Sequence, residues 1–206
     1  TLYGGDGDDG LSGGDDFDAL YGGTGGDLLN GGAGADFMAG GDGGDSYVVD
    51  SASDIVSEAP NQGVDTVISL LASYTLSANV EDMQFAPWGG DGALKNFTGI
   101  GNALDNTITG GEKNDWLDGR GGADSLNGLD GDDVYVVDNV GDIIGESLGN
   151  DTIRTSLSSY VLPALIENIV FTGAGAFSAT GTLSNNRFTG GGVSDSIDGA
   201  GGVALF

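Results

Sequence analysis

The sequence predicts an all-β fold, a solenoid of stacked coils in which two parallel sheets face each other across a thin core. Three observations predict this fold. Glycine-rich segments repeat with a period of nine residues, each repeat pairs a sixth-position acid with a large apolar residue at position 8, and the period continues through stretches that lack the glycines. Two such units make one coil of about 18 residues.

The composition excludes some classes of function and raises one physical problem. The chain has 206 residues, with 42 glycines, 32 acidic and 5 basic residues, no histidine, no cysteine and a formal charge of −27. This charge excludes nucleic acid as a partner, because binding to phosphates needs Lys and Arg. No apolar stretch approaches the roughly 20 residues that span a bilayer. Such a composition is typical of disorder, yet 38% of the residues are hydrophobic. A cation that neutralises the acids would resolve this conflict.

The repeats fall into three blocks when Gly4 is counted as position 1. The first block has five repeats over residues 4–48, including GGTGGDLLN (22–30) and GGAGADFMA (31–39). The second block covers 101–136 and includes GGEKNDWLD (110–118), and a weaker third block covers 181–206. Chance does not explain so regular a pairing of acid and apolar residue.

This spacing predicts the shape of each unit. Positions 7–9 form a short strand that turns the position 8 side chain into the core and its neighbours outward. Positions 1–6 reverse the chain, and glycine allows the positive φ angles that tight turns need.

Two apolar connectors continue the nine-residue step between the blocks. The two halves also match each other, since YVVDSASDIVSE (47–58) parallels YVVDNVGDIIGE (135–146). After Tyr47 and Tyr135, the step predicts core positions at Val56, Val67 (following a two-residue insertion), Leu76, Phe85, Ile144, Ile153, Leu162 and Phe171.

The expected organisation is therefore a duplicated block and connector. It comprises a first glycine block (1–57), connector coils that continue the solenoid (58–100), a second block (101–145), a second connector (146–180) and a third, degenerate and truncated block (181–206). The sequence begins and ends part-way through repeats, so we expect it to be a segment of a longer protein.

The acids at position 6 point to a metal. Each would lie above the acid of the next coil, and such stacked carboxylates repel each other unless a cation lies between them. Carboxylate and carbonyl oxygens are the ligands that Ca²⁺ prefers. Mg²⁺ is smaller and dehydrates reluctantly, and the lack of Cys and His disfavours Zn²⁺.

The repeats resemble G-G-x-G-x-D-x-U-x, the signature of the RTX (repeats-in-toxin) family, with its hemolysin-type calcium-binding repeats. The resemblance implies a parallel β-roll that binds several Ca²⁺ ions, about five to eight here. It also implies a secreted, extracellular or cell-surface protein, exported by a type I secretion apparatus and folding outside the cell when it meets calcium.

The resemblance further implies which atoms hold each ion. Position 6 acids of two stacked turns would bind together with carbonyls at positions 2 and 4 of the upstream turn and 1 and 3 of the downstream turn. In the first block these residues are Gly5, Gly7, Asp9, Gly14, Asp16, Asp18, Gly22, Gly23, Thr24, Gly25, Asp27, Gly31, Gly32, Ala33, Gly34, Asp36, Gly40, Asp42, Asp45 and Asp54. In the second they are Asn106, Gly111, Lys113, Asp115, Gly119, Gly121, Gly122, Asp124, Gly128, Asp130, Asp133, Asp142 and Asp151.

Several residues depart from the family pattern. Asn106 and Asn186 are neutral at position 6, which weakens the expected sites. Lys113 replaces the glycine at position 4, and Ala204 replaces an acid, so the third block is not expected to hold an ion.

Catalysis is not expected of this chain, because without histidine there is no Ser-His-Asp triad or H-E-x-x-H zinc site. An enzymatic domain would lie elsewhere in the parent protein. The alternative function is a carbohydrate- or surface-binding module of an adhesin, S-layer or matrix, which binds polysaccharide or another protomer. Trp88 and Trp116 are its candidate aromatics, although packing against the next coil explains Trp116 as well, and Leu28 and Phe37 occupy outward positions. The few arginines are interpreted as surface or acid-neutralising charges.

Overall fold

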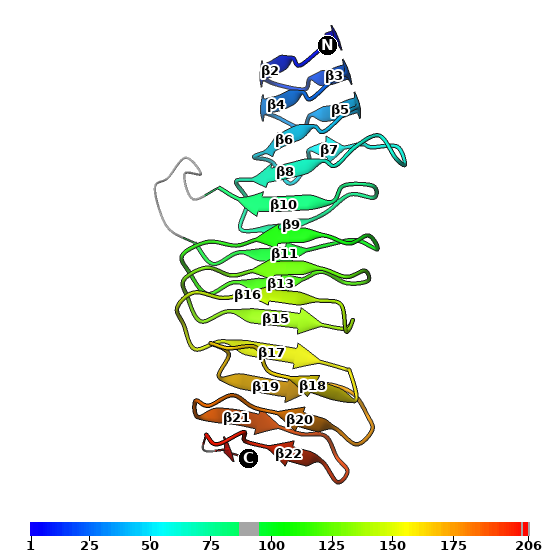
Figure 1. Ribbon diagram of the computed structural model, residues 1–206. Helices are drawn as coiled ribbons and strands as arrows, with labels where there is room; N and C mark the ends of the chain where they lie inside the picture. Colours follow the sequence, from blue (N-terminus) through cyan, green and yellow to red (C-terminus); the bar gives the residue numbers. More distant parts are fainter. Residues whose placement is uncertain (87–94, 203, 206) are drawn as a thin grey trace.

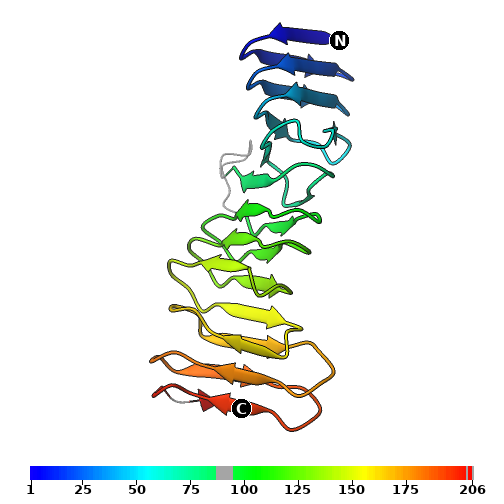
Figure 2. The ribbon, with the colours of Figure 1, turned by 45° about the vertical axis from the view of Figure 1, so that its right-hand side comes forward.

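The predicted solenoid is confirmed by the computed structural model, which describes residues 1–86, 95–202 and 204–205. Within these residues the chain forms 23 strands and no helix, and all the strand pairs are parallel. The coils stack from the N-terminus at one end to the C-terminus at the other, as Figures 1 and 2 show from two directions. None of the described segments is a helix long and apolar enough to cross a membrane.

Odd-numbered strands form one wall of the solenoid, in two sheets. The first sheet contains β1 (Leu2–Asp6), β3 (Ala19–Thr24), β5 (Phe37–Asp42) and β7 (Ile55–Val56). The second contains β9 (Ser73–Thr75), β11 (Thr98–Ile100), β13 (Trp116–Asp118), β15 (Val134–Val137), β17 (Thr152–Thr155), β19 (Asn168–Phe171), β21 (Asn186–Thr189) and β23 (Ala204–Leu205).

Even-numbered strands form the facing wall, also in two sheets. The longer sheet contains β2 (Gly10–Asp15), β4 (Leu28–Ala33), β6 (Ser46–Val49), β8 (Thr66–Ser69), β10 (Asp82–Phe85), β12 (Thr107–Thr109), β14 (Ser125–Asn127) and β16 (Ile143–Gly145). The shorter one contains β18 (Ser159–Val161), β20 (Ser178–Thr180) and β22 (Ser196–Asp198).

The core consists of the position 8 side chains, as the nine-residue step predicts. They lie in register between coils, so each large apolar side chain packs on the one above it. The buried members in the glycine blocks are Leu11, Leu20, Leu29, Met38, Tyr47, Ile108, Leu117, Leu126, Tyr135 and Phe188. Each coil thus contributes only a few large side chains to the core, so a coil depends on its neighbours for stability.

The register of the strand pairs departs by two residues from the predicted step in both connectors. Tyr74, rather than Leu76, lies in register with the core residue Leu117 through Gly99, and Val67 pairs with Met83 rather than with a residue two places later. In the second connector Tyr160 and Ile169 likewise take the expected places of Leu162 and Phe171. The turns of the connectors are shorter because they have no six-residue glycine loop. The side chains placed by the step are nevertheless buried, Ile144 only partly.

Strands of the first block are longer than positions 7–9. β2, β3, β4 and β5 each have six residues and include positions 1–3 of the next turn. Here glycines at position 2 of stacked turns pair directly, as Gly5 does with Gly23 and Gly14 with Gly32. Position 2 carries a side chain in three repeats of the second block (Asn102, Arg120 and Leu129), and β12, β13 and β14 have the three residues expected.

Candidate metal centre

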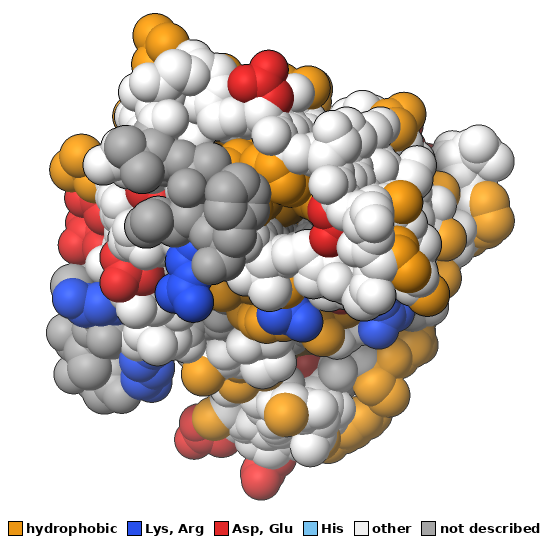
Figure 3. Space-filling model, turned by 90° about the horizontal axis from the view of Figure 1, so that it is seen from below, with side chains coloured by type: hydrophobic (Ala, Val, Ile, Leu, Met, Phe, Trp, Pro, Cys, Tyr) orange, Lys and Arg blue, Asp and Glu red, His pale blue; other side chains and the backbone are white. Residues whose placement is uncertain are grey.

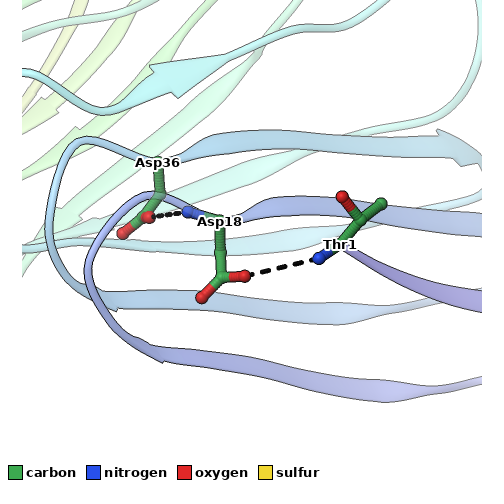
Figure 4. Close-up of polar contacts among 3 residues, drawn as sticks. All are labelled: Thr1, Asp18 and Asp36. Carbon is green, nitrogen blue, oxygen red and sulfur yellow. Dashed lines mark hydrogen bonds and ion pairs between the residues drawn. The ribbon is translucent and has the colours of Figure 1, made fainter.

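Two ladders of carboxylates run along the edges of the glycine blocks. The backbone N–H of a position 6 residue donates to Oδ1 of the position 6 residue 18 further along, as in Asp9 to Asp27 (2.8 Å) and Asp18 to Asp36 (2.7 Å). Figure 4 shows the second contact, with the Thr1 amino group 3.5 Å from Asp18 Oδ1. The stacking predicted from the repeat spacing is therefore present.

The two ladders continue through both blocks. The residues of one ladder precede the even-numbered strands, and those of the other precede the odd-numbered strands. One steps from Asp27 to Asp45 and then over 20 residues to Asp65, and the other steps from Asp36 to Asp54. In the second block the same contacts join Asn106 to Asp124, Asp124 to Asp142, Asp115 to Asp133 and Asp133 to Asp151. Each position 6 residue thus contacts the position 6 residue two repeats later, as the repeat spacing predicts.

The second oxygen of most of these carboxylates has no partner. Oδ1 accepts a backbone N–H in Asp27, Asp36, Asp45, Asp124, Asp133 and Asp151, whereas Oδ2 is buried without a partner in these residues and in Asp9. Oδ2 of Asp54, Asp115 and Asp142 instead accepts backbone N–H groups. A buried acceptor without a donor costs about 1–3 kcal/mol, and more when it is charged. The set of donors is oxygen only, so these atoms fit a hard divalent cation such as Ca²⁺. Ca²⁺ would supply the missing positive charge to stacked carboxylates.

Glycine at position 1 is required for space. The position 6 side chain folds back over it, so a Cβ on Gly22 would lie 2.2 Å from Asp27 Oδ2 and 2.5 Å from the Gly40 carbonyl oxygen. A Cβ on Gly119 would lie 2.1 Å from Asp124 Oδ2. Sequence reasoning assigned the glycines to turn conformation, which explains positions 2 and 4 but not position 1.

Positions 2 and 4 have the positive φ angles that the turns were expected to need. At position 4, φ is 101° in Gly7 and 119° in Gly25. Asp16 at position 4 and Arg120 and Leu129 at position 2 adopt the same left-handed region, with φ of 68°, 62° and 73°. These three residues adopt this conformation although they are not glycine, whereas Asn102 at position 2 and Lys113 at position 4 do not.

Turn backbones that the predicted scheme groups together do meet. The N–H of Gly7 donates to the Thr24 carbonyl and that of Gly25 to the Asp42 carbonyl, each at 2.7 Å. A Cβ on Gly131 would lie 2.6 Å from the carbonyl carbon of Lys113, so the backbone at Lys113 faces the next turn despite its side chain.

Comparison with known proteins identifies these turns. The family model for the RTX calcium-binding nonapeptide repeat matches residues 1–20, 12–47 and 100–135. Residues 1–47 and 100–135 carry RTX calcium-binding nonapeptide repeats. The matched residues are those of the first and second glycine blocks, in which the carboxylate ladders lie. No curated protein and no solved structure gives a significant match.

The two asparagines of the RTX frame form different contacts from the aspartates. The Asn106 side-chain amide donates to the carbonyls of Val80 (3.2 Å) and Glu81 (3.0 Å), and that of Asn186 donates to Ile166 (2.9 Å). An amide N–H therefore occupies the place where a carboxylate would need a cation. This agrees with the expectation that the asparagines weaken a metal site.

A separate set of hydrogen bonds, made by position 5 side chains of the RTX repeats, was not predicted. The N–H of Gly26 donates to Asp8 Oδ1 (2.8 Å), and that of Ala123 to Asp105 Oδ1 (2.7 Å), each 18 residues back. Asn114 and Asp132 accept the same contact in the second block. The position 5 side chains reach forward along the chain, whereas those at position 6 reach back. The signal was a short acid or amide at position 5, obscured by the many acids nearby.

The described arginines form no ion pairs with the ladders. The N-terminal amino group pairs with Asp18, but within the described residues no arginine forms an ion pair with a carboxylate. Arg154 instead lies over the Trp116 ring, 5.5 Å from its centroid, which supports the packing interpretation of Trp116. Lys and Arg side chains form separate spots in the end-on view of Figure 3.

The electrostatics of the RTX ladder favours protons or cations. Burial, reinforced by neighbouring carboxylates against the opposing backbone hydrogen bonds, raises the pKa of Asp133 and Asp151 to about 7 and that of Asp124 to about 6. Burial also raises the pKa of Asp45 and Asp115. These carboxylates therefore lack enough positive charge from the protein itself.

Proposed function

We propose that this chain is a calcium-binding RTX module that folds outside the cell when it binds Ca²⁺, and that it serves a larger exported protein in secretion, folding and stability. One observation carries this proposal: buried position 6 carboxylates are stacked at the coil spacing, each with an oxygen that lacks a partner. The family match supports calcium as the cation.

Charge repulsion makes folding conditional. The formal charge of −27 resists compaction, and the core of one or two large side chains per strand is thin. Where free Ca²⁺ is far below the ~10⁻⁴–10⁻³ M affinities of extracellular modules, the carboxylates stay unneutralised and the chain stays unfolded. At higher calcium the free energy of binding becomes free energy of folding.

This behaviour suits export. An unfolded chain passes through a narrow secretion channel, and a chain without cysteine needs no oxidising compartment to fold. After export, binding of extracellular Ca²⁺ then drives folding. We therefore place the module in an exported protein that uses a type I secretion apparatus.

The decisive experiment is far-UV circular dichroism of the chain at neutral pH, first in EGTA and then in millimolar Ca²⁺. We expect a disordered spectrum in EGTA and a β spectrum after calcium, with MgCl₂ at equal concentration as the control that does not fold the chain. A β spectrum in EGTA that calcium leaves unchanged would contradict the proposal.

A second candidate function rests on an aromatic row on the outer face of the first sheet. Tyr3 and Tyr21 are stacked with ring centroids 5.1 Å apart, and Phe37 lies 5.7 Å from Tyr21. Tyr3 is 76% exposed. Exposed rings in a row can stack on the faces of sugar rings, so this surface would bind polysaccharide. Trp88, the other candidate aromatic, lies outside the described residues.

This candidate is tested with a double variant, Tyr3→Ala and Tyr21→Ala, on glycan arrays and against alginate. We expect about fivefold or greater loss of affinity, since two stacking contacts of about 0.5–1.5 kcal/mol each disappear. Phe17→Ala is the matched control, because Phe17 is 69% exposed in a turn. Unchanged binding in the double variant, or no glycan bound by the wild type, contradicts the candidate.

We propose no catalytic role for this chain. The carboxylates that resemble a catalytic pair are members of the ladders, and the sequence holds no histidine. Any enzymatic activity of the parent protein would belong to another domain.

A further inference from the structure

Two clusters of three carboxylates each join a glutamate, which the predicted turn sites do not include, to two ladder aspartates. One contains Asp45, Glu58 and Asp65, and the other contains Asp133, Glu146 and Asp151; in each, one oxygen per residue lies within 4.8 Å of the others. The aspartates are at most 1% exposed. Glu58 and Glu146 belong to no glycine repeat, so the RTX scheme gives them no role.

The solenoid itself brings each glutamate to the ladder. Glu58 lies 18 residues after Gly40 and so occupies the position 1 place of a turn that has lost its glycine. The space beside Gly40 is already taken by Asp45 Oδ2, which a Cβ there would meet at 2.0 Å. The Glu58 side chain therefore approaches the same carboxylate from the coil below.

A buried tyrosine fixes the orientation of each glutamate. The Tyr47 hydroxyl, fully buried in the core, donates to Glu58 Oε1 and accepts the Gly40 N–H at 2.6 Å. Tyr135 repeats the arrangement, donating to Glu146 and accepting the Gly128 N–H at 3.0 Å. The glutamate follows its tyrosine by 11 residues in both copies.

The two copies build the same cluster through different loops. Asp45 and Asp65 are 20 residues apart, whereas Asp133 and Asp151 are 18 apart, yet the N–H of the first donates to the second at 2.8 Å in both. The two extra residues in the first loop leave the cluster intact. The geometry is therefore set by the carboxylates and the tyrosine rather than by the loop.

Unpartnered, deeply buried oxygens face each cluster. Oδ2 of Asp45 and Oε2 of Glu58 have no hydrogen-bond partner in the first cluster, and Oδ2 of Asp133 and Oδ2 of Asp151 have none in the second. Three clustered carboxylates, two of them with such an oxygen, are an unstable arrangement without a cation, because no basic side chain is among the cluster residues.

We propose that these clusters are two side-chain cation sites, one closing the end of each glycine block, in which a hard divalent cation of the calcium class is bound by three carboxylates. They differ from the RTX turn sites, where two carboxylates act with glycine carbonyls, because the turn after Glu58 (APNQG) has no glycine pair. Glu58 and Glu146 bind the cation, and Tyr47 and Tyr135 orient them.

The sites extend the proposed calcium binding but do not depend on calcium-gated folding. Their count is measured in the folded protein at saturating Ca²⁺, whereas gated folding is decided in EGTA, so either proposal can fail alone.

Native mass spectrometry of the whole chain at saturating Ca²⁺ counts the ions. Glu58→Gln and Glu146→Gln are each expected to lose one ion and the double variant two, because an amide oxygen still accepts the tyrosine hydroxyl but supplies no charge. The control Glu112→Gln, at an exposed turn position, keeps the wild-type count. A double variant that binds as many ions as the wild type overturns the proposal.

Terbium luminescence provides a test that needs no glutamate variant. Tyr47 and Tyr135 touch the ligand side chains, so they are expected to sensitise bound Tb³⁺ under excitation of tyrosine. Replacing both by Phe should remove most of the tyrosine-sensitised emission, measured as the difference between excitation where tyrosine and tryptophan both absorb and excitation at a longer wavelength where tryptophan alone absorbs. Tyr21→Phe is the control. Emission that survives in the double Phe variant overturns the assignment.

Discussion

Replacing Gly22 by alanine is expected to destabilise the calcium-loaded protein by about 2–4 kcal/mol and to raise the calcium concentration needed for folding. The added Cβ would meet Asp27 Oδ2 at 2.2 Å and the Gly40 carbonyl oxygen at 2.5 Å. A side chain can rotate away, but the backbone of the next coil cannot move without breaking its parallel pairing. Asp27 would also lose its contact with the Asp9 N–H.

Gly10→Ala is the matched control for this substitution. A Cβ on Gly10 meets nothing within 4 Å, and its φ is not positive, so we expect a change within about 0.5 kcal/mol. Denaturant unfolding in saturating Ca²⁺, together with a calcium titration followed by circular dichroism, measures both quantities. Equal stability of the two variants would show that position 1 glycine is not needed for space.

Stability of the metal-free chain is expected to fall as the pH rises from about 5 to about 7.5. Burial raises the pKa of Glu58, Asp133 and Asp151 to about 7 and that of Asp65 and Asp124 to about 6, against about 4 in an unfolded chain. The folded state then binds more protons than the unfolded state over this range, so folding weakens with increasing pH. The stabilisation from these protonated carboxyl groups is complete below about pH 4, the pKa of the unfolded chain, and it is lost as the pH rises past the folded pKa values of about 6 and 7.

The folded fraction in EGTA, followed by far-UV circular dichroism at several pH values, measures this dependence, and it is expected to fall to a disordered chain by neutral pH. Calcium should flatten it at higher pH, because the cation takes the place of the protons on the carboxylates. Asp133→Asn, which cannot titrate, should give a shallower slope than the wild type. A metal-free chain that becomes more stable between pH 5 and 7.5 would show that these carboxylates are stabilised by charge rather than destabilised.

Much of the fold could be predicted because the repeat is periodic. The position 8 side chains Leu20, Leu29 and Met38 are all fully buried, and the Asp ladder has the 18-residue step that the sequence indicates. Periodicity encodes both features, since a side chain that recurs in register must stack on its own copy.

Connector register could not be predicted in the same way. The step of nine residues predicts Leu76 as a core residue, and Leu76 is buried, but Tyr74 rather than Leu76 lies in register with Gly99 of the next coil, because the turn that precedes β9 is short and lacks glycine. Turn length depends on which backbone carbonyls can accept hydrogen bonds from the neighbouring coils. The local sequence alone does not specify these contacts. The resulting error is two residues, a spacing that keeps the side chain on the same face of the strand.

The sequence by itself determined the period, the identity of the core side chains and the stacking of position 6 acids, because each follows from residues recurring at a fixed spacing. Only the tertiary structure decided that Glu58 and Glu146 join the ladders, that Tyr47 and Tyr135 hold them and that position 1 must be glycine. These features depend on contacts between different coils, where residues far apart in sequence lie close together beside a buried carboxylate.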